Sequence, residues 1–201
     1  MSFHRRLGAG TGPLGGSGLV AQWGGSSLIQ SLQTGQLDMN GVTTKTATIT
    51  AVDTSRSICV FNGSKNTSGE GTANDASGFA FRVALTNSTT VTADIVLNVS
   101  AAGRLVNFTV VEFLPGVLRS VQRGSITMTG VLTNTATITG VNPAKSLVTY
   151  NGYTHTYTSD PPMYLNRVGV ILTLTNATTV TTDHGATNGT KITNFEVVEF
   201  F

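Results

Sequence analysis

A tandem duplication is the feature that most constrains this chain. Residues 31–50 return without a gap as residues 120–139, and the two stretches are identical at 12 of 20 positions. The same offset of 89 residues carries Asn62-Gly63 onto Asn151-Gly152, and it shortens to 87 where residues 107–113 match residues 194–200. A feature that occurs in only one copy is not required by the shared fold, so it is a candidate for function.

The duplication predicts the domain organisation. We expect an extended N-terminal arm over residues 1–30, a first repeat over 31–113, a short linker over 114–119 and a second repeat over 120–201. A domain of about 85 residues can fold alone with modest stability. The period is too long for a solenoid unit, which needs at least three copies to bury a core.

Each repeat shows short alternating runs of apolar and polar residues, which is the period of a half-buried strand. In the first repeat we expect six strands, near residues 32–39, 45–52, 57–61, 79–86, 90–99 and 105–113. The third is expected to end at Asn62-Gly63, a pair typical of tight turns. No amphipathic helix is evident, so the predicted class is all-β: two homologous antiparallel β-sandwiches, Ig-like or jelly-roll-like.

The first 30 residues have a different composition, rich in glycine. Such a segment buries too little apolar surface to offset its backbone entropy, so it is expected to be disordered when free. It also carries apolar and basic anchors, which favour docking onto a neighbouring subunit over an ordinary tail. The candidate docking residues are Arg5, Arg6, Leu19, Val20, Trp23, Leu28 and Ile29. Gly10, Gly12 and Gly15 fit a dinucleotide-binding pattern, but no strand precedes them, and we predict no cofactor.

The two copies diverge most between Asn151 and Arg167. Tyrosine gives a large contact area at a low entropic cost, and loops that vary on a constant scaffold often specify contacts. One interpretation is therefore a recognition loop, and the other is a longer hairpin whose tyrosines pack on their own domain. The candidate recognition residues are Tyr153, His155, Tyr157 and Tyr164.

The residues that usually carry chemistry are sparse. Three histidines lie without ligand spacing, which predicts no metal site. A net charge of +2 with 11% charged residues does not support a nucleic-acid footprint, and no apolar run is long enough for membrane insertion. The single cysteine, Cys59, is expected to be a small buried strand residue. No catalytic residues are predicted, and the chain is expected not to be an enzyme.

One carboxylate is duplicated, as Glu112 and Glu199 within Val-Val-Glu-Phe. From the alternation of its strand we expect this glutamate to point away from the core. It is then a solvated or interface ion-pair partner, since acid–base catalysis needs a second carboxylate or a nucleophile beside it.

The recurring phrases Ser120-Val-Gln-Arg-Gly-Ser-Ile-Thr-Met, Thr-Ala-Thr-Ile-Thr, Leu-Thr-Asn-Ala-Thr-Thr-Val-Thr and Phe-Glu-Val-Val-Glu-Phe resemble β-domain repeats of virion structural proteins from tailed bacteriophages. The resemblance covers residues 31–201 and implies a structural role in the virion, assembled in the host cytoplasm, with no active-site residues.

Three functions follow as expectations. The first is a tail, collar or fibre-associated component that binds other virion proteins and copies of itself. The second is a capsid decoration protein. The third, from a different class, is a module that binds host-surface glycans through Tyr153, Tyr157 and Tyr164. Homo-oligomers are expected because isolated β-domains leave edge strands that need cover.

Overall fold

The computed structural model describes residues 28–66, 80–96, 104–156, 169–185, 187 and 189–201. The described chain is built from antiparallel strands and two short 3₁₀ turns, η1 (Thr54–Arg56) and η3 (Pro143–Lys145). The predicted all-β, sandwich-like class is therefore confirmed. Whether each repeat folds as an independent domain stays a prediction.

The first repeat forms two facing three-stranded sheets. One has the order β1 (Ile29–Asp38), β6 (Arg104–Phe113), β3 (Ser57–Asn66), and the other has the order β2 (Thr44–Thr48), β5 (Thr90–Ile95), β4 (Phe81–Asn87). Alternating valine, threonine and phenylalanine suit these strands, since β-branched and aromatic side chains pack well on a pleated surface.

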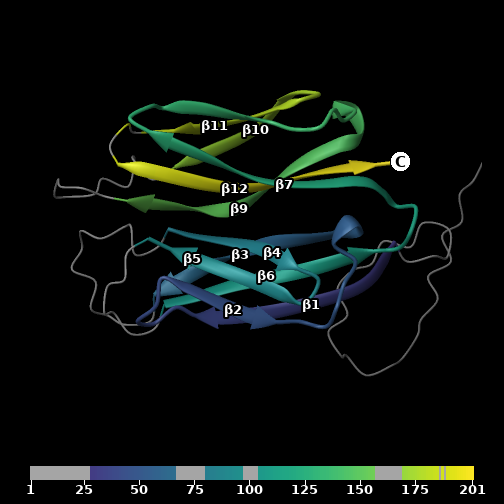
Figure 1. Cartoon of the computed structure of the whole chain (residues 1–201), viewed down its shortest axis with the longest axis horizontal. Helices are drawn as coiled ribbons and strands as arrows, with labels where there is room; N and C mark the ends of the chain where they lie inside the picture. Colours follow the sequence, from purple (N-terminus) through teal and green to yellow (C-terminus); the bar gives the residue numbers. More distant parts are fainter. Residues whose placement is uncertain (1–27, 67–79, 97–103, 157–168, 186, 188) are drawn as a thin grey trace, which may run out of the picture.

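The second repeat has the same arrangement. One sheet has the order β7 (Leu118–Thr129), β12 (Thr190–Phe200), β9 (Ser146–Thr156), and the other has the order β8 (Thr133–Thr137), β11 (Thr179–His184), β10 (Val170–Asn176). Figure 1 shows these strands, green to yellow, stacked on the purple-to-teal strands of the first repeat.

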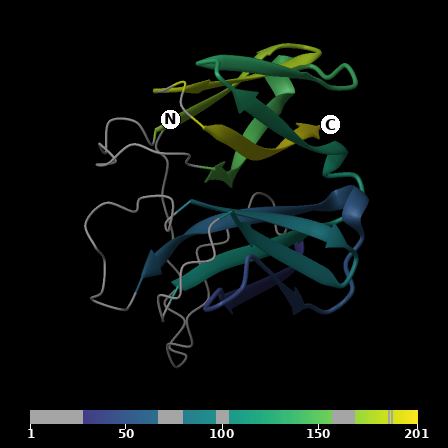
Figure 2. The ribbon, with the colours of Figure 1, turned by 60° about the vertical axis from the view of Figure 1, so that its left-hand side comes forward.

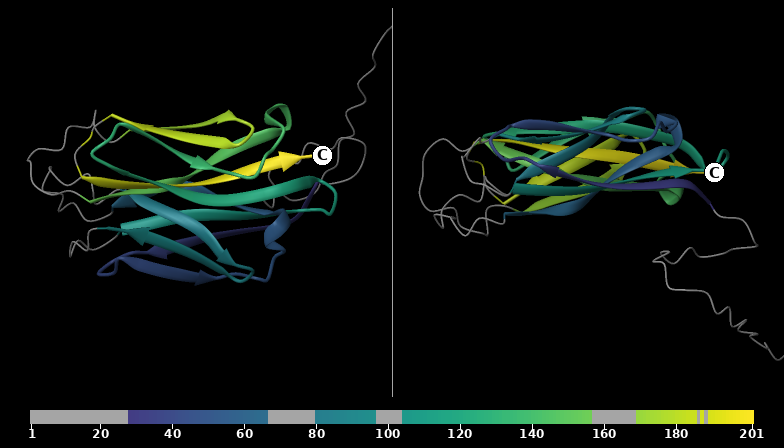
Figure 3. Two further views of the ribbon diagram at one scale, coloured as in Figure 1. Left: turned by 45° about the horizontal axis from the view of Figure 1, so that its top comes forward. Right: turned by 90° about the horizontal axis from the view of Figure 1, so that it is seen from below.

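The two repeats contact one another along their length. Figure 2 shows them one above the other, and in Figure 3 the strands of both run obliquely along the same long axis. Edge strands β4 and β9 meet at a single pairing between Arg82 and Gly152, which links a sheet of each repeat into one six-stranded sheet. Beside the linker, the rings of Phe113 and Phe200 pack edge to face at 6.3 Å.

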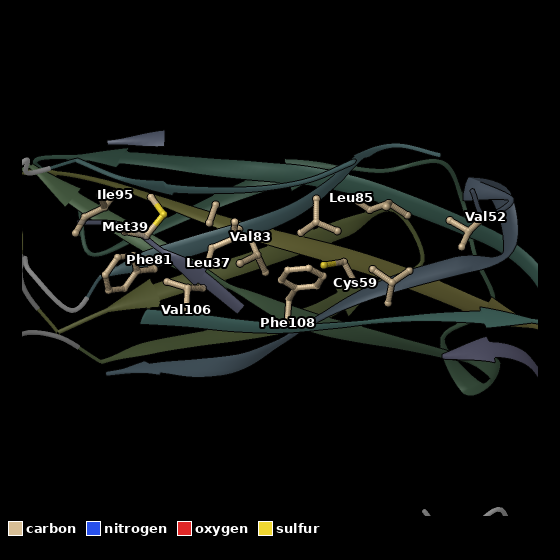
Figure 4. Packing of buried hydrophobic residues seen from close by; sticks show 13 residues of the cluster. Leu37, Met39, Val52, Cys59, Phe81, Val83, Leu85, Ile95, Val106 and Phe108 are labelled. Carbon is tan, nitrogen blue, oxygen red and sulfur yellow. The ribbon is translucent and has the colours of Figure 1, made fainter. Parts of the chain in front are cut away.

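Each sandwich has its own apolar core. In the first, Phe108 and Cys59 point toward one another in the middle of the core, as Figure 4 shows. Phe108 lies directly over Gly35, where a Cβ atom would come within 2.4 Å of the ring; Phe195 covers Gly124 in the same way in the second repeat. This aromatic-over-glycine pair is therefore part of the duplicated fold. The buried position of Cys59 confirms its prediction.

The Asn-Gly pairs do not form tight turns. Asn62-Gly63 lies inside β3 and Asn151-Gly152 inside β9, and the pairing register shifts at both places. Gly63 and Gly152 have φ values of 106° and 88°, which only glycine adopts easily. The prediction was wrong because a glycine at positive φ serves a β-bulge as well as a turn.

The strands also begin earlier than predicted. β1 begins at Ile29 and β7 at Leu118, so Ile29 pairs with Phe113 in a sheet instead of belonging to an arm. The carbonyl of Leu28 accepts a hydrogen bond from the amide of Leu114 at 3.0 Å. The other predicted docking residues, Arg5, Arg6, Leu19, Val20 and Trp23, lie outside the described residues.

The duplicated glutamate faces the core side of its strand, not away from it. Glu112 and Glu199 are buried at one end of each sandwich. Glu112 accepts hydrogen bonds from the Asp53 amide at 3.1 Å and the Ser31 hydroxyl at 3.0 Å, and it pairs with Arg56 at 2.8 Å. Its role as an ion-pair partner was expected, but burial and the backbone contact make it a structural clamp and not a solvated group.

Candidate functional site

The contact between the repeats is a sheet face resting on a sandwich edge. The outer face of β7-β12-β9, called here the docking face, lies against β3, β4 and η1. We call that second surface the receiving edge, because β3 and β4 are the neighbouring edge strands of the two sheets in the first repeat. An uncovered edge exposes unpaired backbone groups, and the docking face covers them.

A buried ion pair holds this contact together. The Arg123 Nε donates to Glu196 Oε1 at 2.8 Å, and the other Glu196 oxygen accepts from the backbone amide of Cys59 at 3.0 Å. The Arg123 guanidinium also donates to the carbonyl of Thr54 at 3.0 Å and to that of Ser57. One arginine and one glutamate of the second repeat thus satisfy three backbone groups of the first.

Burial controls the electrostatics of this pair. The side chain of Glu196 is only 1% exposed, and burial raises its pKa, while Arg123 and the Cys59 amide oppose the rise. Removing Arg123 leaves the buried Glu196 carboxylate uncompensated, which costs more than the net value of the pair. The Arg123 side chain is 26% exposed, so removing Glu196 leaves a charge that water still reaches. Burial and the nearby Glu196 carboxylate raise the pKa of Cys59 to about 12, so this thiol stays protonated and unreactive near neutral pH.

Further contacts extend the interface. The side-chain amide of Asn194 donates to the carbonyl of Val83 at 3.3 Å. The rings of Phe61 and Tyr150 meet edge to face at 6.2 Å, and burial raises the pKa of Tyr150. A groove of about 250 Å³ between the repeats is lined partly by Arg123 and Glu196, so it belongs to the same interface.

Gly152 is required by the close approach of the two repeats. A Cβ atom on Gly152 would lie 2.1 Å from the carbonyl oxygen of Phe81. The equivalent Gly63 has nothing within 4 Å, although its φ is also positive. The glycine therefore serves the bulge in both copies and the interface in one.

The first repeat carries an equivalent of the docking face, with different chemistry. The duplication places Thr34 at the position of Arg123 and Thr109 at the position of Glu196. Thr34 and Thr109 pair directly across β1 and β6, as Arg123 and Glu196 do across β7 and β12. The charged pair is thus specific to the copy that docks within the chain.

A second candidate site lies inside the second repeat, at one end of its sandwich. There the core-facing positions are polar where the first repeat is mostly apolar. His184 replaces Ile95, Thr182 replaces Ala93, and Thr193 replaces Val106. The cluster consists of Tyr153 and His155 from β9, Thr182 and His184 from β11, and Lys191 and Thr193 from β12.

His184 is the most unusual member of this polar cluster. It is 2% exposed, and neither ring nitrogen has a hydrogen-bond partner among the described residues. Burial lowers its pKa to about 4, with further contributions from Lys191 and His155. Its ring packs edge to face on Tyr153 at 5.1 Å, and burial raises the pKa of that phenol to about 12.

Burial also lowers the pKa of Lys191. The polar cluster as described contains no carboxylate, and its proton-binding groups are His155, His184 and Lys191. Within the described ranges, no group of three or more histidine, cysteine, aspartate or glutamate side chains is placed to hold a metal ion. What the arrangement can do is bind or release a proton in the interior.

Two of the four predicted recognition residues lie in a strand, and the other two lie outside the described residues. Tyr153 and His155 do not lie in a loop: they belong to β9, where His155 is buried and Tyr153 is half-buried. Their placement in a loop was wrong because the bulge at Asn151-Gly152 lets β9 continue to Thr156, and Tyr153 packs on its own repeat as the second interpretation expected. A role in recognition stays a prediction. Tyr157 and Tyr164 lie outside the described residues.

Sequence reasoning missed Arg123, Glu196, His184 and Lys191. A signal for three of them was available in the duplication. At aligned positions, two threonines of the first repeat become Arg123 and Glu196, and one isoleucine becomes His184. Lys191 gives no such signal, because Arg104 stands at its position and is also buried.

Comparison with known proteins gives no match: no family model, curated protein or solved structure is significantly similar to the chain. Among the helices of the described residues, none has the length and apolar character that crossing a membrane requires.

Proposed function

We propose that the chain is a non-enzymatic structural protein of a bacteriophage virion, most favourably a tail, collar or fibre-associated component. The observation that carries the proposal is the buried Arg123–Glu196 contact, which fixes the two repeats face to edge. A fixed spacing between two sandwiches suits a building element of a larger assembly. The resemblance of residues 31–201 to virion β-domain repeats is the reason for proposing a virion as that assembly.

Other features support the same reading. The Cys59 thiol is buried and protonated, so it is not available as a nucleophile. Only 11% of the residues are charged, so self-repulsion is weak and close packing with neighbouring subunits is tolerated.

A capsid decoration protein is the alternative within the same class. The glycan-binding alternative has lost part of its basis, because Tyr153 packs on His184 and its ring is not free to stack on a sugar. Tyr157 and Tyr164 lie outside the described residues, so their part in that alternative stays a prediction.

The test is the position and copy number of the chain in purified particles. Particles banded on a density gradient are analysed by quantitative mass spectrometry against the major capsid protein, with the particle-free fraction of the same lysate as control. A few to a few dozen copies supports a tail or neck component, and hundreds of copies supports decoration. A chain found only in the particle-free fraction contradicts the virion proposal.

A further inference from the structure

The duplication gives each repeat both surfaces of the internal contact, but the chain uses only one of each. The docking face of the second repeat is occupied, and so is the receiving edge of the first. The equivalent face of the first repeat is the outer side of β1-β6-β3, which we call the free face. The equivalent edge of the second repeat is formed by β10, η3 and the part of β9 that precedes its pairing with β4 at Gly152, and we call it the free edge.

At the free edge, side chains that pack on the core remain partly exposed to solvent. In the covered edge of the first repeat, Cys59 and Val83 are fully buried at 0% exposure, and Leu85 is also buried. The residues that the duplication places at the same positions are Val148, Leu172 and Leu174. All three pack on the second core but are only partly buried. The comparison indicates that this edge lacks the cover that its counterpart has.

The free face keeps an apolar row that docking uses. In the docking face, Val121, Val198 and Leu147 lie side by side across β7, β12 and β9. Docking covers the middle of this row, where Val198 is 1% exposed, while Leu147 at its end stays 41% exposed. The same register in the first repeat gives the row Leu32, Val111 and Ile58. There Leu32 is 57% exposed, and Val111 and Ile58 are half-buried.

We infer that the free face of one molecule docks on the free edge of a second copy of this chain, in the geometry that the two repeats already show within one molecule. The occupant is a second copy because the established internal contact joins equivalents of these same two surfaces. Each molecule then offers one face and one edge, so the association is head to tail and produces chains or closed rings. This inference rests on the proposed function, because it specifies how such a building element self-assembles.

The docking chemistry differs from that of the internal contact. Thr34 and Thr109 replace the ion pair, so the contact between molecules is neutral and depends on the apolar row.

Two substitutions separate the surfaces. Leu32→Arg places a charge in the free face, where the side chain is exposed and folding is tolerant. Thr173→Arg places a charge on β10 of the free edge. Its counterpart in the first repeat, Ala84, lines the groove between the repeats, so a bulky charged side chain at position 173 obstructs docking. Val131→Arg, on an exposed side chain of the turn between β7 and β8, is the matched control.

The experiment is sedimentation velocity of the full-length chain from about 1 to about 100 µM. The wild type and the Val131→Arg control form species larger than dimers, and each surface variant weakens association about tenfold or more. An equimolar mixture of the two surface variants has one intact face and one intact edge in total, so it forms dimers and nothing larger.

Three results overturn the inference: a monomeric wild type, association that neither surface variant weakens, or a mixture that associates no better than either variant alone. None of them bears on whether the chain is found in virions, so failure here and failure of the proposed function are distinguishable. Circular dichroism of each variant confirms that a loss of association is not a loss of folding.

Discussion

His184 makes the stability of the second repeat sensitive to acid. The ring is buried beside Lys191 on β12 and beside Tyr153 and His155 on β9, and its pKa is lowered from 6.5 to about 4. Between these two values the unfolded chain binds a proton at this histidine and the folded chain does not. Stability is therefore complete above pH 6.5 and is lost as the pH falls toward 4.

The size of the effect follows from the displacement of the pKa. At about 1.36 kcal/mol per pH unit, a fall from 6.5 to about 4 corresponds to about 3 kcal/mol of unfolding free energy. That is a large part of the 5–15 kcal/mol or so by which a typical domain is stable. The change is expected in the second repeat only, because Ile95 stands at the equivalent position in the first.

The matched control is His184→Ile, which installs the side chain that the first repeat uses. Urea denaturation of both proteins at several pH values between about 7.5 and about 4 gives the difference in unfolding free energy. Titrating groups outside the polar cluster, including Glu196 with its raised pKa, are present in both proteins and cancel in that difference. Lys191 and His155 are coupled to His184, so part of the difference passes through them. We expect the isoleucine variant to gain about 3 kcal/mol over the wild type on acidification. A difference that stays constant with pH would refute the reasoning.

Two further predictions concern the contact between the repeats. Arg123→Thr is expected to cost about 3 kcal/mol, because it strands the buried Glu196 carboxylate, and Glu196→Thr is expected to cost less, because the Arg123 side chain is 26% exposed. The double variant costs clearly less than the sum; a double-mutant cycle measured by denaturation tests this, and additive costs contradict it. Gly63→Ala is expected to destabilise the chain by the roughly 1–2 kcal/mol that a left-handed conformation costs a residue with a Cβ atom. Gly152→Ala is expected to cost more, because its new Cβ atom also meets the Phe81 carbonyl. Equal melting temperatures for the two alanine variants would contradict this.

Local patterns were enough to predict the strands. Alternation along one segment reports on the two faces of that segment, so six strands per repeat and the all-β class could be predicted from sequence. The errors arose where a residue's neighbours come from distant parts of the chain. Glu112 lies on the same side of β6 as the buried Val106, Phe108 and Val110, so the alternation itself places it on the core side. What β6 alone cannot identify is its partners, the Asp53 amide and Arg56, which meet it at the end of the sandwich.

The candidate site depends on a contact between the two repeats. The alternation of apolar and polar residues along a single strand does not predict which surfaces will meet. Even so, the duplication contains a usable signal. Two repeats with the same fold need similar residues at the positions that maintain it. Aligned positions at which the repeats differ therefore indicate a role that only one repeat has. Arg123 and Glu196 stand where the first repeat has Thr34 and Thr109, in a chain with few charges, and these two side chains hydrogen-bond to the backbone of the first repeat.

The same logic explains why a duplicated chain with a single internal contact is left with unmatched surfaces. Docking a face on an edge is a heterologous contact, and two repeats joined in this way always leave one face and one edge uncovered. An isologous pairing, face on face or edge on edge, would instead leave two surfaces of the same kind uncovered. The covered edge buries Cys59 and Val83 completely, whereas the free edge leaves Val148 and Leu172 only partly buried. The asymmetry of the fold is thus a direct consequence of how its two halves meet, and it gives assembly a direction.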